Sequence, residues 1–102
     1  MMLKEGSTLY VRIDHKIGEA METEQDAMDC MAYLQEMAKG RLVLAGLFGD
    51  IEQECVDGAM LIFEAKDLDE ATKLSDADPI IARGFYRYEL RKWNLMQVSE
   101  GA

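Results

Sequence analysis

The sequence has few of the residues on which many functional sites depend. It contains a single histidine, two cysteines and one proline among 102 residues. Two cysteines cannot build a disulfide framework, and a structural zinc site needs three or four suitably spaced ligands. No such ligand spacing is present, so we expect no metal. The glycines match neither nucleotide-binding pattern, and we expect no cofactor. No segment resembles a signal peptide or a membrane span, and the expected location is the cytoplasm, with reduced thiols.

Positive charge is also scarce. Eleven basic side chains face twenty acidic ones, which gives a net charge of −9. A field of this sign repels phosphate backbones and anionic lipid, so we expect neither nucleic acid nor a membrane as a partner. The balance of 49% apolar and 30% charged residues is that of a globular chain rather than a disordered one. A chain this short forms one domain with a thin core, to which self-association would add.

Two kinds of apolar pattern predict four strands. Alternation of apolar and polar residues predicts strands over 8–15 and 85–93. A further strand is predicted over 41–48, with Val43 and Leu44 at its centre, and a short, nearly continuous apolar run predicts another over 59–65. The intervening segment 49–57 is polar and predicts a turn or a long hairpin loop.

Capping residues predict two helices between these strands. A Thr-x-x-Asp capping box begins the first helix at Thr23, and Gly40 ends it. Asp67 caps the second helix, which breaks at Asp78-Pro79 because the residue before proline avoids the α region. The order βαββαβ predicts an α+β, ferredoxin-like fold, a four-stranded antiparallel sheet with two helices on one face. We expect a single domain over 1–102, with a core at about 8–94 and a tail at 95–102.

Two helices on one face leave the other face of the sheet bare. Along the last strand this bare face carries either the odd-numbered residues from Phe85 to Trp93 or the even-numbered residues from Tyr86 to Leu90. Tyr10 and the Met60–Ile62 pair indicate a partly apolar face. Because an exposed apolar patch usually marks an interface, we predict a homodimer that pairs through the open sheet face.

Three segments together resemble the YCII-related protein family. They are Leu9-Tyr10-Val11, the stretch 32–46 that ends in Gly40-Arg41-Leu42-Val43-Leu44-Ala45-Gly46, and Asp76-Ala77-Asp78-Pro79 followed by Gly84. The resemblance runs from about Leu9 to Trp93. It implies a ferredoxin-like subunit that dimerises sheet to sheet into a dimeric α/β barrel. It also implies acid–base chemistry of the isomerase or lyase type, including a dehydrochlorinase that acts on a chlorinated hydroxyquinol.

The resemblance also singles out site residues. The family commonly pairs a histidine of the first helix with the aspartate of the Asp-Pro turn. Asp78 matches that aspartate, whereas Cys30 stands at the position of the histidine. An arginine and a proline that are frequent in the family are replaced by Ala27 and Leu47. The acid–base pair of the family is therefore not intact in this chain.

We hypothesise that His15 takes the role of the missing histidine. The predicted topology gathers His15, Cys30, Cys55 and Asp78 at one edge of the sheet. Histidine is the proton carrier suited to neutral pH, so His15 would be the base, oriented by Asp78, and could activate Cys30 as a thiolate. The alternatives are a half-exposed strand end for His15, apolar filling for Cys30 and turn initiation for Asp78.

Ligand-binding candidates come from the strands. Arg12, Arg87 and Arg91 could line the barrel and hold an acidic or phenolic ligand, with solvated surface charge as the alternative. Tyr10 is a further candidate for substrate binding. We expect a small-molecule enzyme that performs acid–base chemistry on a cyclic or aromatic metabolite. The alternative is a non-catalytic dimeric barrel that binds a small ligand or serves as an accessory subunit.

Overall fold

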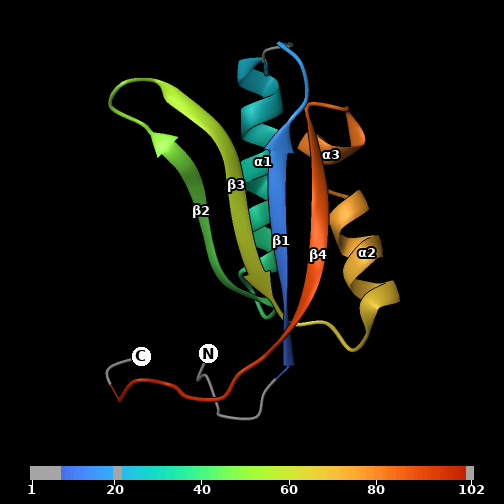
Figure 1. The fold of residues 1–102 in the computed structure, drawn as a ribbon. Coiled ribbons are helices and arrows are strands. Elements are labelled where there is room, and N and C mark those ends of the chain that lie inside the picture. The colour runs from blue at the N-terminus through green and yellow to red at the C-terminus, as the bar shows by residue number, and fades with distance from the viewer. Residues whose placement is uncertain (1–7, 20–21, 101–102) are drawn as a thin grey trace.

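The computed structural model describes residues 8–19 and 22–100, and it has a sheet with helices on one side (Figure 1). The strands pair antiparallel in the spatial order β2-β3-β1-β4. The predicted α+β, ferredoxin-like fold is confirmed. In chain order the elements are β1 (Thr8–Lys16), α1 (Glu24–Met37), β2 (Leu42–Asp50), β3 (Cys55–Phe63), α2 (Leu68–Asp76), α3 (Pro79–Ala82) and β4 (Tyr86–Asn94).

The register decides which residues share a face of the sheet. Arg12 of β1 lies opposite Leu61 of β3 and Leu90 of β4, and this row faces the helices. The alternate row on the open face includes Val11 and Arg91. Of the two alternatives for β4, the even-numbered residues therefore face the helices and the odd-numbered residues lie on the open face.

The helices begin at the predicted caps. At the start of α1 the Asp26 amide donates to the Thr23 hydroxyl at 3.1 Å, and the Thr23 amide donates to the Asp26 carboxylate at 2.8 Å. The second helix ends before Asp78-Pro79, as predicted. Pro79 then begins a further helix of four residues, α3, which Asp78 caps. Proline suits the first position of a helix, where its missing N–H would have no partner. This short helix was not predicted, and it fixes Asp78 at the junction of α2 and α3.

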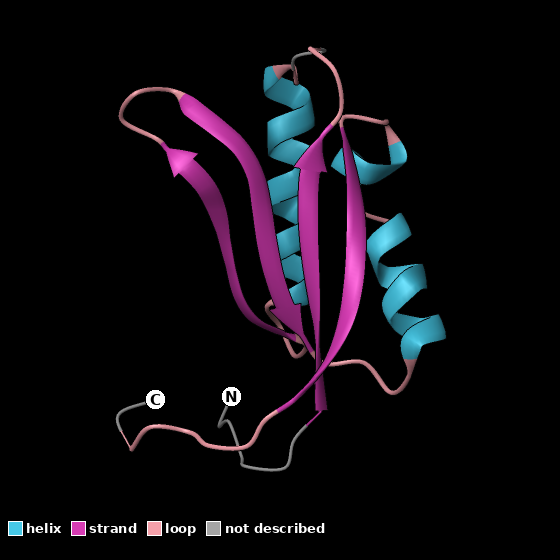
Figure 2. Ribbon diagram, viewed as in Figure 1, coloured by secondary structure: helices cyan, strands magenta, loops and turns pink. Residues whose placement is uncertain are grey.

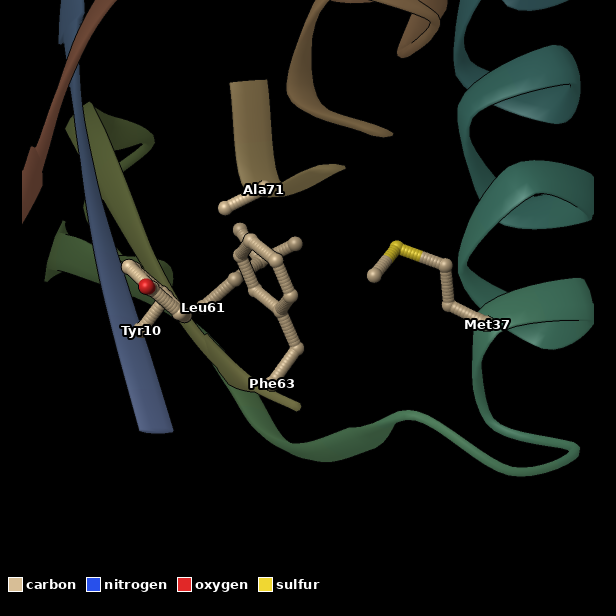
Figure 3. Packing of buried hydrophobic residues seen from close by; sticks show 5 residues of the cluster. All are labelled: Tyr10, Met37, Leu61, Phe63 and Ala71. Carbon is tan, nitrogen blue, oxygen red and sulfur yellow. The ribbon is translucent and has the colours of Figure 1, made fainter. Parts of the chain in front are cut away.

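The hydrophobic core lies between the sheet and the C-terminal end of α1 (Figure 3). Its buried members are Tyr10, Met37, Leu61, Phe63 and Ala71, and the rings of Tyr10 and Phe63 lie 6.5 Å apart. The interpretation of Tyr10 as part of the bare face is wrong, because its position in the register turns it toward the helices. Only 4% of Tyr10 is exposed, so it is a core residue in this structure.

The β2–β3 hairpin extends away from α1 (Figure 2). Its strands are longer than predicted and leave a turn at 51–54 within the segment expected to be a loop. Gly49 has a φ of +111°, and a side chain there would overlap the Cys55 carbonyl oxygen. Because the hairpin curves away from α1 (Figure 1), Leu47 remains 58% exposed on the helix side. The space between α1 and this part of the hairpin becomes the cleft described below.

Candidate active site between α1 and the sheet

A buried ionic cluster lies beneath the helices. The Nε of Arg12 donates to Asp14 Oδ1 at 2.8 Å, and its Nη2 donates to Asp14 Oδ2 at 2.8 Å and to Asp78 Oδ2 at 2.7 Å. All three side chains are at most 1% exposed. Buried charge is costly unless it is paired and hydrogen-bonded, so these contacts hold the cluster together.

Two elements bring the cluster together. Alternation along β1 places Arg12 and Asp14 on the helix side of the central strand. Asp78 comes from the far end of the chain as the cap of α3, where the Ile80 amide donates to its Oδ1 at 3.1 Å. Arg83, just after α3, bonds Asp26 and Asp29 of α1 at 2.7 and 2.8 Å. This pairing fixes α3 against α1 and keeps Asp78 in place.

Burial and pairing act in opposite directions on the charges of the cluster. Burial raises the pKa of Asp14 above its ordinary value, although the hydrogen bonds from Arg12 oppose this and the charge of Asp78 adds to it. Burial also disfavours the charged guanidinium, but the bonds to both aspartates outweigh it and raise the pKa of Arg12. The cluster thus keeps its cation and holds a carboxyl whose affinity for protons is increased.

The cluster forms the floor of a cleft of about 390 Å³ between α1, β2 and β3. This volume is within the range of small-molecule sites, which typically spans roughly 300–1,000 Å³. The walls are mainly apolar: Ala27, Met31, Leu34, Ala45, Leu47, Ala59, Leu61 and Ile80. A small ring would therefore contact hydrocarbon on its sides and polar groups at one edge.

Cys30 of α1 also lines this cleft, together with Glu22 before the helix. Burial, with the nearby charges of Asp78 and Glu22, raises the pKa of Cys30 to about 12. At neutral pH the thiol is therefore protonated, which is unfavourable for the predicted thiolate nucleophile. Burial also raises the pKa of Glu22, and the neighbouring Asp26 adds to that rise.

His15 does not meet Asp78 in this structure. It occupies the open face of β1, and its Nε2 lies 3.1 Å from Glu89 Oε1. Asp78 lies on the helix side, so the predicted His15–Asp78 hydrogen bond is not formed. The topological argument placed both residues at one edge but could not distinguish the two faces. Cys55 is likewise apart from the cleft, exposed at the start of β3.

Comparison with known proteins adds a family and a structural relative. The model of the YCII-related domain matches residues 8–94. The chain belongs to the YCII-related domain family. A solved structure of 5-chloro-2-hydroxyhydroquinone dehydrochlorinase from Burkholderia phenoliruptrix AC1100, in complex with 2,5-dihydroxybenzoquinone, has 16% identity and a TM-score of 0.64. The alignment covers 84% of this chain and 93% of that one, and at this identity it shows the shared fold alone. No curated protein matches the sequence.

Other features bear on cofactors and membranes in this YCII-related chain. Over residues 8–19 and 22–100, no three His, Cys, Asp or Glu side chains gather in a way that could hold a metal ion. None of the helices in the part of the chain that is described is long and apolar enough for a membrane span.

Sequence reasoning named Arg12, Cys30 and Asp78 as candidates, and all three line this cleft, but it did not name Asp14 and Glu22, which line it too. The signal for Asp14 was available, because charged residues at i and i+2 on one face of a central strand are rarely buried unless they pair. The three candidate arginines are separated, since Arg12 faces the helices whereas Arg87 and Arg91 lie on the open face.

Proposed function

We propose that the chain is a small-molecule enzyme that performs acid–base chemistry, an isomerase or a lyase of the dehydrochlorinase type, on a cyclic or aromatic metabolite. The observation that carries this proposal is the Arg12–Asp14–Asp78 cluster at the floor of an apolar cleft. Buried polar clusters in concave sites are unusual without a function, because a core of apolar residues would be at least as stable. Family membership and the fold of the dehydrochlorinase are consistent with this proposal.

In the proposed reaction the carboxyls exchange the proton and Arg12 holds them in position. Asp78 is the first candidate for the base because it matches the aspartate of the family's acid–base pair; it accepts one hydrogen bond from Arg12 and one from the Ile80 amide, whereas Asp14 accepts two from Arg12. The carboxylate takes a proton from the substrate and becomes the carboxylic acid. In an elimination the electron pair of the broken bond to hydrogen forms a new double bond of the ring, and chloride leaves a tetrahedral ring carbon with the electron pair of the C–Cl bond. The apolar walls would exclude water from the ring while the proton moves.

Asp78→Asn tests this proposal with matched chemistry. Asparagine keeps the capping oxygen of α3 but cannot accept the proton, so the fold should persist while turnover falls by roughly 10²- to 10⁴-fold. The measurement is chloride release from 5-chloro-2-hydroxyhydroquinone, the substrate in the name of the structural relative. Asp76→Asn, at the exposed end of α2, is the control and should keep full activity.

Two results would decide against this reaction. If the wild-type protein binds 2,5-dihydroxybenzoquinone in a calorimetric titration but releases no chloride, the dehydrochlorinase reaction is rejected. If Asp78→Asn retains full turnover, Asp78 is not the base, and Asp14→Asn would become the next variant to measure.

A second candidate function is a barrel that binds a small ligand without catalysis. The observation that favours it is the protonated Cys30 at the family's histidine position, with His15 on the other face. Without a histidine in the cleft, the site relies on carboxyls that have almost no accessible surface. Tight binding with unchanged ligand after long incubation would support this function over the enzyme.

We also propose a homodimer through the open sheet face. Leu44, Phe48 and Trp93 lie on this face and are 62%, 43% and 44% exposed. Burial of such residues is favourable at about 25 cal/mol per Å² of apolar surface, and an isologous contact would cover all three at once. Phe48→Lys should shift the protein toward the monomer in sedimentation equilibrium, whereas Met28→Lys on the exposed side of α1 should not. A wild-type chain that stays monomeric at high concentration would reject the dimer.

A further inference from the structure

One nitrogen of the buried cluster has no partner. Among the described residues, Arg12 Nη1 is a buried side-chain atom that makes no hydrogen bond. The Nε and Nη2 of the same guanidinium are fully used by Asp14 and Asp78. A buried charged donor without an acceptor is costly, and native structures contain few of them. Arg12 is also a lining residue of the cleft, so a ligand held there would lie next to this side chain.

We propose that Arg12 Nη1 is the recognition donor of the cleft, and that it binds a neutral carbonyl oxygen on a small planar ring. This inference rests on the proposed function, because it names the class of ligand for the same cleft. The ligand would receive the missing hydrogen bond at one edge. Its ring would lie between α1 and the hairpin, against residues such as Leu34 and Leu47.

The charges of the site favour a neutral oxygen over an anionic one. Two carboxylates, Asp14 and Asp78, already surround the single guanidinium, and Glu22 adds a third acidic group to the cleft lining. An anionic ligand would place another negative charge among them in a region of low dielectric constant. A carbonyl oxygen accepts the hydrogen bond without adding a charge.

Tyr33 is a competitor for this nitrogen. Its hydroxyl donates to the Leu74 carbonyl oxygen at 2.6 Å. Burial raises the pKa of Tyr33 to about 12, and the charge of Arg12 opposes that rise, so the two groups are neighbours. A hydrogen-bonding interaction with Arg12 also lowers the Tyr33 pKa, but Arg12 Nη1 makes no hydrogen bond of ordinary length and angle among the described residues.

Three probes of matched shape test the inference by fluorine NMR titration of the wild-type chain. They are 4-fluoroacetophenone, with a neutral carbonyl, 1-fluoro-4-isopropylbenzene, with no acceptor, and 4-fluorobenzenesulfonate, with a permanent charge. We expect the ketone to bind roughly tenfold or more tightly than the hydrocarbon, the cost of leaving a buried donor unpaired. The sulfonate should bind more weakly than the ketone. In ¹⁵N-arginine spectra the side-chain signals of Arg12 should shift with the ketone and not with the hydrocarbon.

Variants separate the donor from the cleft without disturbing the cluster. Ala45→Leu, on the β2 side of the cleft, fills part of it and should abolish ketone binding, whereas Ala32→Leu on the exposed side of α1 should leave it unchanged. Tyr33→Phe should keep the preference for the ketone, and loss of that preference would assign the donor role to Tyr33.

The outcomes distinguish this inference from the proposed function. If the ketone and the hydrocarbon bind equally, the role of Arg12 Nη1 is overturned while the cleft survives as a site. If the sulfonate binds most tightly, the neutral class of ligand is overturned. If no probe binds, or if the ketone binds but Ala45→Leu leaves its binding unchanged, both the inference and the cleft-based function are rejected.

Discussion

Each face of the sheet departs at some positions from the usual distribution of polar and apolar residues. On the helix side, β1 buries the charged side chains of Arg12 and Asp14. On the open side, apolar side chains such as Phe48 and Trp93 stay exposed. Neither arrangement favours the stability of an isolated chain, because buried charge and exposed hydrocarbon both raise its free energy. The proposed reaction would account for the buried charges beneath the helices, and the proposed dimer would account for the exposed hydrocarbon on the opposite face.

Removal of the buried cation should produce the largest effect. In Arg12→Met, Asp14 and Asp78 lose their shared partner while they remain buried, and the free energy of unfolding should fall by about 3–5 kcal/mol at neutral pH. Without Arg12 the pKa of Asp14 rises further above its unfolded value of about 3.9. The folded state then favours the protonated carboxyl, so the loss of stability is complete above the folded pKa and shrinks as the pH falls.

Urea unfolding of Arg12→Met and the wild-type chain at pH 7.5 and pH 5 checks this prediction. Arg87→Met, on the open face, is the matched control and should lose little stability at either pH. A loss that is large but equal at the two pH values would show that packing, rather than unpaired carboxylates, causes it.

The two thiols should differ strongly in reactivity. Burial raises the pKa of Cys30 from about 9.0 to about 12, which reduces the thiolate roughly a thousandfold at pH 8. Cys55 is exposed at the hairpin. With iodoacetamide, Cys55 should be alkylated far faster than Cys30, as measured by mass spectrometry of peptides over time. In urea the two rates should converge, and equal rates in the native state would mean that the cleft is open to solvent at Cys30.

The sequence predicted elements better than faces. Apolar alternation along 8–15 and the caps at Thr23 and Asp67 predicted the strand and both longer helices, because these patterns are local. Alternation divides a strand into two faces but does not say which face the helices cover. That ambiguity misplaced Tyr10 and left the orientation of β4 open. Helix α3 was missed because four residues are too few to show a period.

For the candidate site, the sequence indicated individual residues but not the contacts between them. The resemblance identified Asp78, and Arg12 was a ligand-binding candidate, yet their contact joins residues 66 positions apart along the chain. The predicted order of strands and helices placed His15 near Asp78, since both residues lie at the same edge of the sheet. Only the register turns His15 toward Glu89 and Arg12 toward Asp78. Long-range pairing of this kind is invisible to local patterns.

Substitution of His15 should have the smallest effect. His15 is 41% exposed and pairs with Glu89, which is 54% exposed, so the pair contributes little to stability. His15→Gln should therefore leave both the unfolding midpoint and the turnover of 5-chloro-2-hydroxyhydroquinone unchanged, in contrast to Asp78→Asn. The opposite pattern, with activity lost in His15→Gln and kept in Asp78→Asn, would move the chemistry to the open face. The reacting groups would then lie on the face through which the proposed dimer forms. In that case His15→Gln would distinguish catalysis from dimer formation, because it would lower turnover without changing the sedimentation behaviour.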